Sequence, residues 1–303
     1  MSIFKRVTLF LLVNILVVTT ITIVLNLFGI QPYLTNHGVD LKTLAIFCLI
    51  WGMAGSIISL LLSKTMAKWQ TGMEIIPENT SSPQYRRLMD IVSKLTKQAG
   101  LPGMPEVGVY RSPEVNAFAT GASSRKALVA VSTGLLDRMD DAEIEGVLGH
   151  EISHVANGDM VTMSLLQGIV NAFVMFLARI LALVVTRSGN SQNNQDSLGM
   201  GYFLCVMLFQ TVFMFLGMIV IATYSRRREY RADEGGAALA GRDKMVRALK
   251  KLQQVIAIQD PRDAGQQTVQ AFKISTPKGW FNLFASHPPL EERIQHLLEI
   301  SIR

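Results

Sequence analysis

Two histidines and a glutamate lie close together in the stretch GHEISHVANGDM, residues 149–160. His150 and His154 are four residues apart, so on a helix both imidazoles project from one side and can bind the same zinc ion. Glu151 then lies within reach of a water molecule beside that ion and can take its proton. Two surface histidines on a charged helix are the alternative. The spacing therefore indicates a metal-dependent hydrolase site that still needs a third ligand.

The best candidate for the third ligand is Glu229 in the stretch RREYRADEGGA, residues 227–237. Asp233 follows four residues later on the same face of an expected helix, where it would orient a ligand histidine through a hydrogen bond. Several small residues allow this helix to pack closely against another: Ala232, Gly235, Gly236 and Ala237. Taken alone, a glutamate among arginines is more typical of a solvated helix face, but the HEISH motif favours the ligand role.

The surrounding pattern predicts a compact α+β region that positions these side chains. Residues 140–159 predict the helix that carries HEISH, with a capping box formed by Asp140 and Glu143. Its apolar face would comprise Ile144, Val147, Leu148, Ile152 and Val155. Segments rich in valine and alanine predict strands, and segments with helical periodicity predict further helices. The predicted strands are residues 106–111, 116–121 and 127–133, and the further helices are residues 82–100, 241–256 and 288–300.

The predicted strand NAFATG, residues 116–121, is a candidate edge strand. An extended substrate could add to such an edge through main-chain hydrogen bonds, which suits a protease with a broad sequence preference. Asn116 and Ala117 are the predicted substrate-binding residues. The alternative is a strand and turn with a structural role only.

Composition and hydrophobic blocks indicate a membrane protein. Hydrophobic residues make up 49% of the 303 residues and charged residues 17%, against about 25% charged residues in soluble proteins. Four blocks reach the roughly 20 residues needed to cross a bilayer, so up to four transmembrane helices are expected: residues 7–27, 43–62, 160–186 and 198–224. The alternatives are a signal peptide for the first block, and a buried hairpin for the last two because Arg179, Gln167 and Asn171 interrupt the third.

Lysine and arginine are frequent before the first block and after the second and fourth, whereas the two loops between paired blocks contain few. This distribution predicts that both termini and the metal site are cytoplasmic. The expected division is two membrane helices in 1–62, a cytoplasmic protease region in 63–159, two apolar helices in 160–224, and a cytoplasmic region completing the zinc site in 225–303.

The net charge of the chain is +6, and its basic residues cluster beside the apolar blocks, so no nucleic-acid partner is expected. Cys48 and Cys205 fall inside apolar blocks and indicate packed thiols.

Four motifs in this order, NAFATG, GHEISHVANGDM, EYRADEGGA and SHPPLEERI, resemble the HtpX family of bacterial membrane-bound zinc metalloproteases, which are related to CAAX prenyl-protein endopeptidases. The resemblance covers essentially the full chain. It implies an α-helical membrane protein with an α+β zincin-like protease domain, one Zn²⁺ per chain, and an active site at the cytoplasmic side of the inner membrane. It also implies His150, His154 and Glu229 as zinc ligands and Glu151 as the catalytic base. Unfolded or damaged membrane proteins in stress quality control would be the substrates.

The oxyanion of a peptidase needs a further hydrogen-bond donor besides zinc, and the sequence offers His287 in SHPP, residues 286–289. Only the resemblance puts His287 near the zinc; the alternative is a histidine in a proline-rich turn that caps the last helix.

Three other functions are weaker alternatives. An intramembrane-cleaving zinc protease would carry its motif within an apolar span, whereas acidic residues precede HEISH here. A prenyl-protein-type zinc protease would have more spans. A non-enzymatic membrane protein with structural zinc would usually have four protein ligands, often cysteines.

Overall fold

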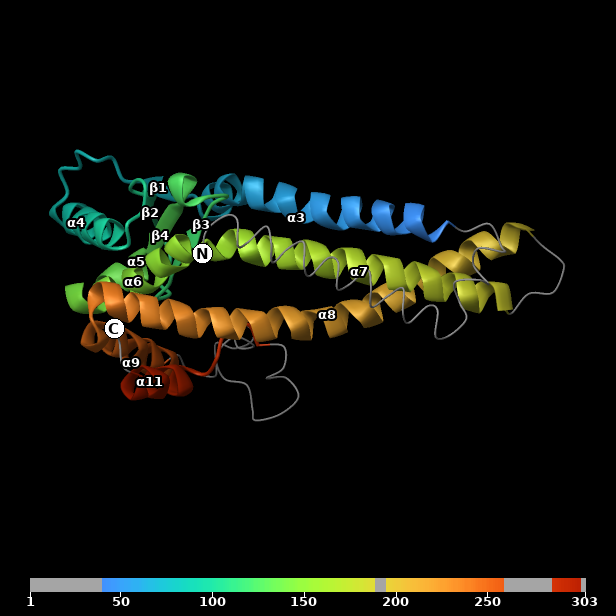
Figure 1. The fold of residues 1–303 in the computed structure, drawn as a ribbon. Helices are drawn as coiled ribbons and strands as arrows, with labels where there is room; N and C mark the ends of the chain where they lie inside the picture. The colour runs from blue at the N-terminus through green and yellow to red at the C-terminus, as the bar shows by residue number, and fades with distance from the viewer. Residues whose placement is uncertain (1–39, 189–194, 259–284, 301–303) are drawn as a thin grey trace. The chain divides into compact units, whose positions relative to one another are not determined.

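The chain forms two compact units in the computed structural model, which describes residues 40–188, 195–258 and 285–300 (Figure 1). One unit comprises Met1–Ser59 and Thr162–Ile221, and the other comprises Leu60–Val161 and Ala222–Arg303. The first predicted membrane helix, residues 7–27, lies outside the described residues.

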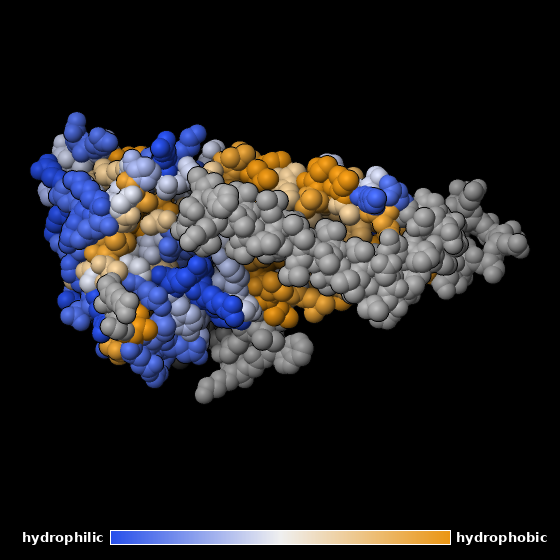
Figure 2. All heavy atoms as spheres, in the orientation of Figure 1, coloured by the Kyte–Doolittle hydropathy of each residue, from blue (hydrophilic) through white to orange (hydrophobic). Residues whose placement is uncertain are grey.

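Three long helices are apolar enough to cross a membrane by length and composition: α3 (Leu41–Thr71), α7 (Asp159–Ser188) and α8 (Gln195–Ala240). They contain the three predicted blocks that fall within the described residues. In the apolar part of α8 only 6% of the residues are buried in protein, and Figure 2 shows the hydrophobic surface of these helices. Water does not favour so large an apolar surface. A hairpin buried in protein therefore does not describe α8, and the fold is that of a membrane protein.

The polar residues that interrupt the third predicted block, in α7, have partners within the first of the two units. Gln167 donates a hydrogen bond to Asn171 Oδ1, one turn further along α7, at 3.0 Å. Arg179 donates to the carbonyl of Met175 at 3.1 Å, and its guanidinium lies 5.7 Å from the centre of the Phe47 ring. Partners of this kind lower the cost of polar groups in an apolar helix, so these residues do not argue against a membrane location for α7.

The second unit contains a four-stranded sheet of β1 (Glu74–Ile75), β2 (Glu106–Tyr110), β3 (Ala117–Thr120) and β4 (Leu128–Ser132). The order is β1-β2-β4-β3, with β2 parallel and β3 antiparallel to β4. All five residues of β4 are buried, as expected for a central apolar strand. The prediction of β2, β3 and β4 is confirmed, and β3 lies at an edge of the sheet, as predicted. The two residues of β1 are too few to give a periodic signal.

Helices of the same unit cover this sheet and one another (Figure 1): α4 (Pro83–Gln98), the 3-10 helix η1 (Ser124–Lys126), α5 (Thr133–Arg138), α6 (Asp141–Asn157), α9 (Arg242–Ile258) and α11 (Leu290–Glu299). Helix α6 packs against β3 and α5 against β4, whereas α4 and α9 pack against α6, and α11 packs against α9. The predicted capping box of α6 is present, since the Asp140 side chain accepts from the Glu143 N–H and the Glu143 side chain accepts from the Asp140 N–H. Gly158 ends α6 in the left-handed conformation (φ 63°), which glycine adopts without strain. The chain begins α7 at the next residue.

Glycines allow α6 to approach the last turns of α8 and the start of α9. A Cβ atom on Gly236 of α8 would lie 2.9 Å from the backbone nitrogen of His150 in α6. A Cβ atom on Gly146 of α6 would lie 2.5 Å from the carbonyl oxygen of Lys244 in α9. The close packing predicted for the GG-containing helix is therefore present. It brings the HEISH turn of α6 next to Glu229 of α8.

Candidate metal centre

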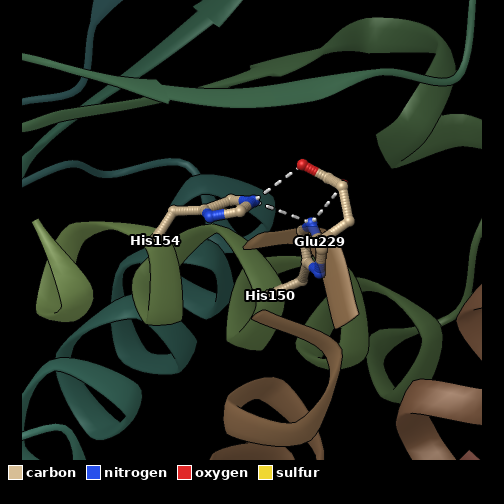
Figure 3. Close-up of side chains that lie close together, drawn as sticks. All are labelled: His150, His154 and Glu229. Atoms are coloured by element: carbon tan, nitrogen blue, oxygen red, sulfur yellow. Dashed lines mark hydrogen bonds and ion pairs between the residues drawn. The ribbon is translucent and has the colours of Figure 1, made fainter. Parts of the chain in front are cut away.

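His150, His154 and Glu229 converge on one point, although α6 and α8 supply them from distant parts of the sequence (Figure 3). The two Nε2 atoms lie 3.1 Å apart. Glu229 Oε2 lies 3.4 Å from His150 Nε2, and Glu229 Oε1 lies 3.4 Å from His154 Nε2. All three side chains are buried. The structure thus brings together the three predicted ligands.

These distances fit a tetrahedral zinc site. Zinc binds imidazole nitrogen and carboxylate oxygen at about 2.0–2.1 Å, so neighbouring ligand atoms of a tetrahedron are about 3.3 Å apart. The separation of the two Nε2 atoms, 3.1 Å, agrees with that edge length. Each Nε2 atom lies 3.4 Å from a different oxygen of Glu229, and one ligand atom from each of the three residues lies within 4.8 Å of the others. Two imidazoles and one carboxylate are also a typical ligand set of catalytic zinc, and they leave one position open. The residues present therefore fit a catalytic metal of this kind.

A hydrogen-bonded chain behind His150 orients its ring. Asp233 Oδ1 lies 2.8 Å from His150 Nδ1, which leaves Nε2 as the nitrogen that faces the cluster. Arg293 of α11 donates two hydrogen bonds to the Asp233 carboxylate, at 2.7 and 2.6 Å. Asp233 was predicted in this position. Sequence reasoning missed Arg293, because nothing in the sequence of α11 marks one of its charged residues as buried.

His154 has an equivalent partner that the sequence analysis also missed. Asp159 Oδ2 lies 2.7 Å from His154 Nδ1, and Asp159 is 2% exposed. The separation of five residues does not by itself bring two side chains together on a helix. The left-handed turn at Gly158 does so, by starting α7 where α6 ends. A carboxylate directly after a helix-ending glycine was the available signal.

The buried groups shift one another's pKa values in the direction of ion pairs. Burial lowers the pKa of His150, but hydrogen bonds with Asp233 and Glu229 outweigh it and raise that pKa to about 9. Burial raises the pKa of Glu229, but the contacts with His150, His154 and His287 outweigh it and hold that pKa well below its ordinary value. Burial also raises the pKa of Asp233, but its hydrogen bonds with Arg293 and His150 outweigh that effect and lower the pKa. Glu229 and Asp233 are therefore ionised at neutral pH and attract positive charge, and a metal ion must displace the proton of His150 to bind.

Glu151 lies beside the cluster and is fixed by the edge strand. Its Oε2 atom accepts a hydrogen bond from the Ala119 N–H of β3 at 2.9 Å. Because main-chain groups alternate in direction along a strand, Ala117 also directs its N–H and C=O away from β4. Asn116 does not, since its N–H donates to Ser132 Oγ and its carbonyl accepts from the Ser132 N–H.

These residues line a single cavity of about 1150 Å³ within the second unit. Its lining includes all three cluster residues, Glu151 and most of β3, together with both predicted substrate-binding residues, Asn116 and Ala117. Asn116 thus lines the cavity even though its main chain is paired. One open cavity joins the metal cluster to the edge strand.

His287 also lies at the cluster, on the segment that precedes α11. Its Nδ1 atom is 2.8 Å from Glu229 Oε2, and its side chain is 45% exposed. Arg226 of α8 donates a hydrogen bond to the Ala285 carbonyl at 2.9 Å, which holds this segment against α8, and Pro288 on the other side of His287 is buried. Arg228 donates to Glu229 Oε1 at 3.0 Å. Every predicted site residue therefore lies at this one cavity or supports it.

The model of peptidase family M48 matches residues 82–301, which is most of the chain. The chain belongs to peptidase family M48. Like other M48 peptidases it is a metalloprotease, and its apolar helices identify it as a membrane protein.

Curated relatives agree with this M48 assignment over nearly the full chain. The chain is 48% identical over 299 residues to "Protease HtpX homolog" of Bacillus velezensis, covering 97% of this chain and 98% of the relative. It is 48% identical over 302 residues to the protein of the same name from Bacillus subtilis (strain 168), with the same coverage, and 47% identical over 298 residues to "Protease HtpX" of Xanthomonas axonopodis pv. citri, covering 97% of each chain. The resemblance to the HtpX family is therefore confirmed.

A solved structure shares the fold of this M48 chain. The crystal structure of S. mikatae Ste24p matches with a TM-score of 0.56 at 19% sequence identity. The match covers 95% of this chain and 66% of that chain, so this chain spans about two thirds of the length of that protein. At this identity the match supports the fold alone.

Proposed function

We propose that the chain is a zinc-dependent endopeptidase in which His150, His154 and Glu229 bind one zinc ion and Glu151 is the general base. The observation that carries this proposal is the convergence of His150, His154 and Glu229, whose ligand atoms lie within 4.8 Å of one another at a cavity that Glu151 also lines. Zinc bound there would polarise the scissile carbonyl and lower the pKa of a water molecule from about 15.7 toward about 7.

Glu151 would move the proton. Its Oε2 atom is occupied by the Ala119 N–H, so Oε1 is the oxygen that accepts the proton of the attacking water and then delivers it to the leaving amine. The contact with Ala119 also fixes the carboxylate relative to the edge strand. A substrate that binds to that strand would therefore present its scissile bond at a constant distance from the base.

The substrate main chain would pair with the outward-facing groups of Ala117 on β3, as an added strand. This mode of binding recognises the backbone, so it tolerates many sequences. The Asn116 side chain, which lines the same cavity, would contribute a polar contact to the peptide.

His287 would stabilise the oxyanion that develops on the scissile carbonyl. Its Nδ1 atom contacts Glu229, which leaves Nε2 to donate a hydrogen bond. A donor of this kind contributes roughly 10²–10³-fold to kcat in acyl-transfer enzymes.

We also propose that the active site faces the cytoplasm at the inner membrane and acts on unfolded or damaged membrane proteins under stress. Support comes from the clusters of lysine and arginine beside the apolar helices and from the bacterial relatives named HtpX proteases. The charged residues of α6, among them Asp141 and Glu143, disfavour a motif embedded in lipid, so intramembrane cleavage has less support.

Cleavage of unfolded casein by the full chain in detergent tests the enzymatic part of this proposal. We expect cleavage with zinc, none with a chelator, and none for Glu151→Gln with zinc. Zinc content is measured in the same samples, because the Gln variant should bind zinc as tightly as the unaltered chain. Equal cleavage by both forms, or zinc bound equally after removal of His150 and His154, would refute the assignment.

A further inference from the structure

The cavity beside the metal cluster is lined by both charged and apolar side chains. The charged ones include the cluster residue Glu229 and Glu151. Among the apolar ones, six come from a single face of α9 and recur at the spacing of a helical stripe: Met245, Ala248, Leu249, Leu252, Val255 and Ile256.

The exposure of this stripe increases along α9. Its first three members are each 1% exposed and belong to the hydrophobic core. Leu252, Val255 and Ile256 are only half-buried, although they are as apolar as the first three. Leu252 still contacts the core, whereas Val255 and Ile256 belong to neither core cluster that the described residues form in this unit. The second half of the stripe is therefore apolar surface that lines the cavity instead of filling the core.

We propose that Leu252, Val255 and Ile256 form the subsite for a bulky apolar side chain of the substrate, at one of the two residues that flank the scissile bond. This inference rests on the proposed endopeptidase function and adds a preference to it. The occupant follows from continuity, because the strip, the metal cluster and the edge strand line the same cavity. A peptide on β3 whose scissile carbonyl lies at the cluster must direct some of its alternating side chains into the rest of that space.

The chemistry of the strip selects the class of substrate. Aliphatic surface gains free energy when it covers another apolar side chain, whereas a carboxylate placed there would lose its hydration without a partner. Backbone pairing alone would leave the enzyme indifferent to sequence. With this subsite it cleaves next to leucine, isoleucine, valine, methionine or phenylalanine, which folded soluble proteins bury and unfolded or membrane-derived segments expose.

The first test maps every cleavage site in denatured casein by mass spectrometry, with the zinc-loaded full chain in detergent. We expect large apolar residues to be enriched at one flanking position. Peptides that differ only there should then show a kcat/KM for leucine at least about tenfold above that for alanine, since one methylene in an apolar pocket changes kcat/KM by about 10- to 200-fold. No enrichment at either flanking position would overturn the inference, while cleavage itself would leave the proposed function intact.

The second test reverses the preference with Ile256→Lys. A lysine at position 256 should lower kcat/KM at least about tenfold for the peptide with leucine at the flanking position. It should raise kcat/KM for a peptide with glutamate at that position, because the ammonium group can pair with the carboxylate. Gln254→Lys is the matched control. It adds the same charge, but Gln254 is exposed on another face of the same helix. Identical profiles for the two lysine variants would overturn the proposal.

A milder variant keeps the test decisive if Ile256→Lys does not fold. Val255→Ala with Ile256→Ala removes apolar surface outside the core and adds no charge, and the ratio of kcat/KM for the leucine peptide to that for the alanine peptide is measured within this variant. The advantage of leucine over alanine should shrink to about threefold or less. An undiminished advantage would overturn the subsite. Failure of the unaltered chain to cleave any peptide would instead refute the proposed function.

Discussion

Replacing Asp159 by alanine should weaken zinc binding while leaving all three proposed ligands in place. Asp159 Oδ2 lies 2.7 Å from His154 Nδ1, and both residues are buried, so water cannot easily replace the lost acceptor. The contact keeps the proton on Nδ1 and the lone pair on Nε2. Loss of such a partner typically lowers metal affinity 10- to 100-fold, or about 1.4 to 2.8 kcal/mol. Asp159→Asn should lie near the lower value, because the amide oxygen still accepts a hydrogen bond but carries no charge.

Competition between the protein and a chromophoric chelator measures this affinity in detergent. Asp141→Ala is the control, because Asp141 is an exposed acidic residue at the other end of α6. Thermal unfolding in excess chelator separates any contribution of Asp159 to the first turn of α7 from its effect on the metal. If saturating zinc restores activity to Asp159→Ala, the loss lies in affinity. An affinity of Asp159→Ala within about twofold of the unaltered chain would refute the reasoning.

Three further predictions concern stability, each measured by thermal unfolding in detergent. Gly236→Ala should lower the free energy of unfolding by about 1 to 3 kcal/mol, because its Cβ would lie 2.9 Å from the backbone nitrogen of His150. Gly55→Ala, where a Cβ meets nothing within 4 Å, should not lower it. Arg293→Met should cost about 3 to 5 kcal/mol, because it leaves Asp233 as a buried charge without its arginine; adding Asp233→Asn should recover part of that loss, and no recovery would contradict the ion-pair explanation. Burial raises the pKa of Glu145, but its two lysine partners outweigh it and hold that pKa below its usual value of 4.5. The ionised group thus stabilises the fold above pH 4.5 and ceases to do so as the pH falls through the lowered pKa, so Glu145→Gln should cost about 1 kcal/mol near neutral pH, and this cost should shrink as the pH is lowered below 4.5.

The sequence was sufficient where the determinants are local. The HEISH helix, its capping box and its apolar face are set by residues within a few positions of one another, and the structure contains all three. The position of Glu229 at the cluster was predictable because Glu229 and Asp233 repeat the four-residue spacing of the histidines on a helix with small residues. Both pairs are periodic signals that survive without knowledge of the tertiary fold.

The supporting residues were not predictable in the same way. Asp159 reaches His154 only because Gly158 adopts a left-handed conformation, and in sequence Asp159 resembles any polar residue after a helix end. Arg293 lies among three charged or polar neighbours in LEERIQ, and it becomes buried only when α11 packs against α8. The uncovered half of the α9 stripe was likewise invisible, because its residues have the same spacing as the core residues before them.

The buried charges around the site give a further argument for a cation there. Three carboxylates are almost fully buried, those of Glu229, Asp233 and Asp159, and the only guanidinium buried to nearly the same degree among the described residues is that of Arg293. Arg228, which is partly buried, also donates to Glu229. When the two histidines are neutral, as metal ligands are, the three carboxylates exceed their two arginine partners by one charge. Buried charge without a partner is unfavourable by several kcal/mol per ion, so this excess favours a cation at the cluster. The carboxylate behind each histidine acts in the same direction, because it would raise the basicity of the ring toward a metal ion.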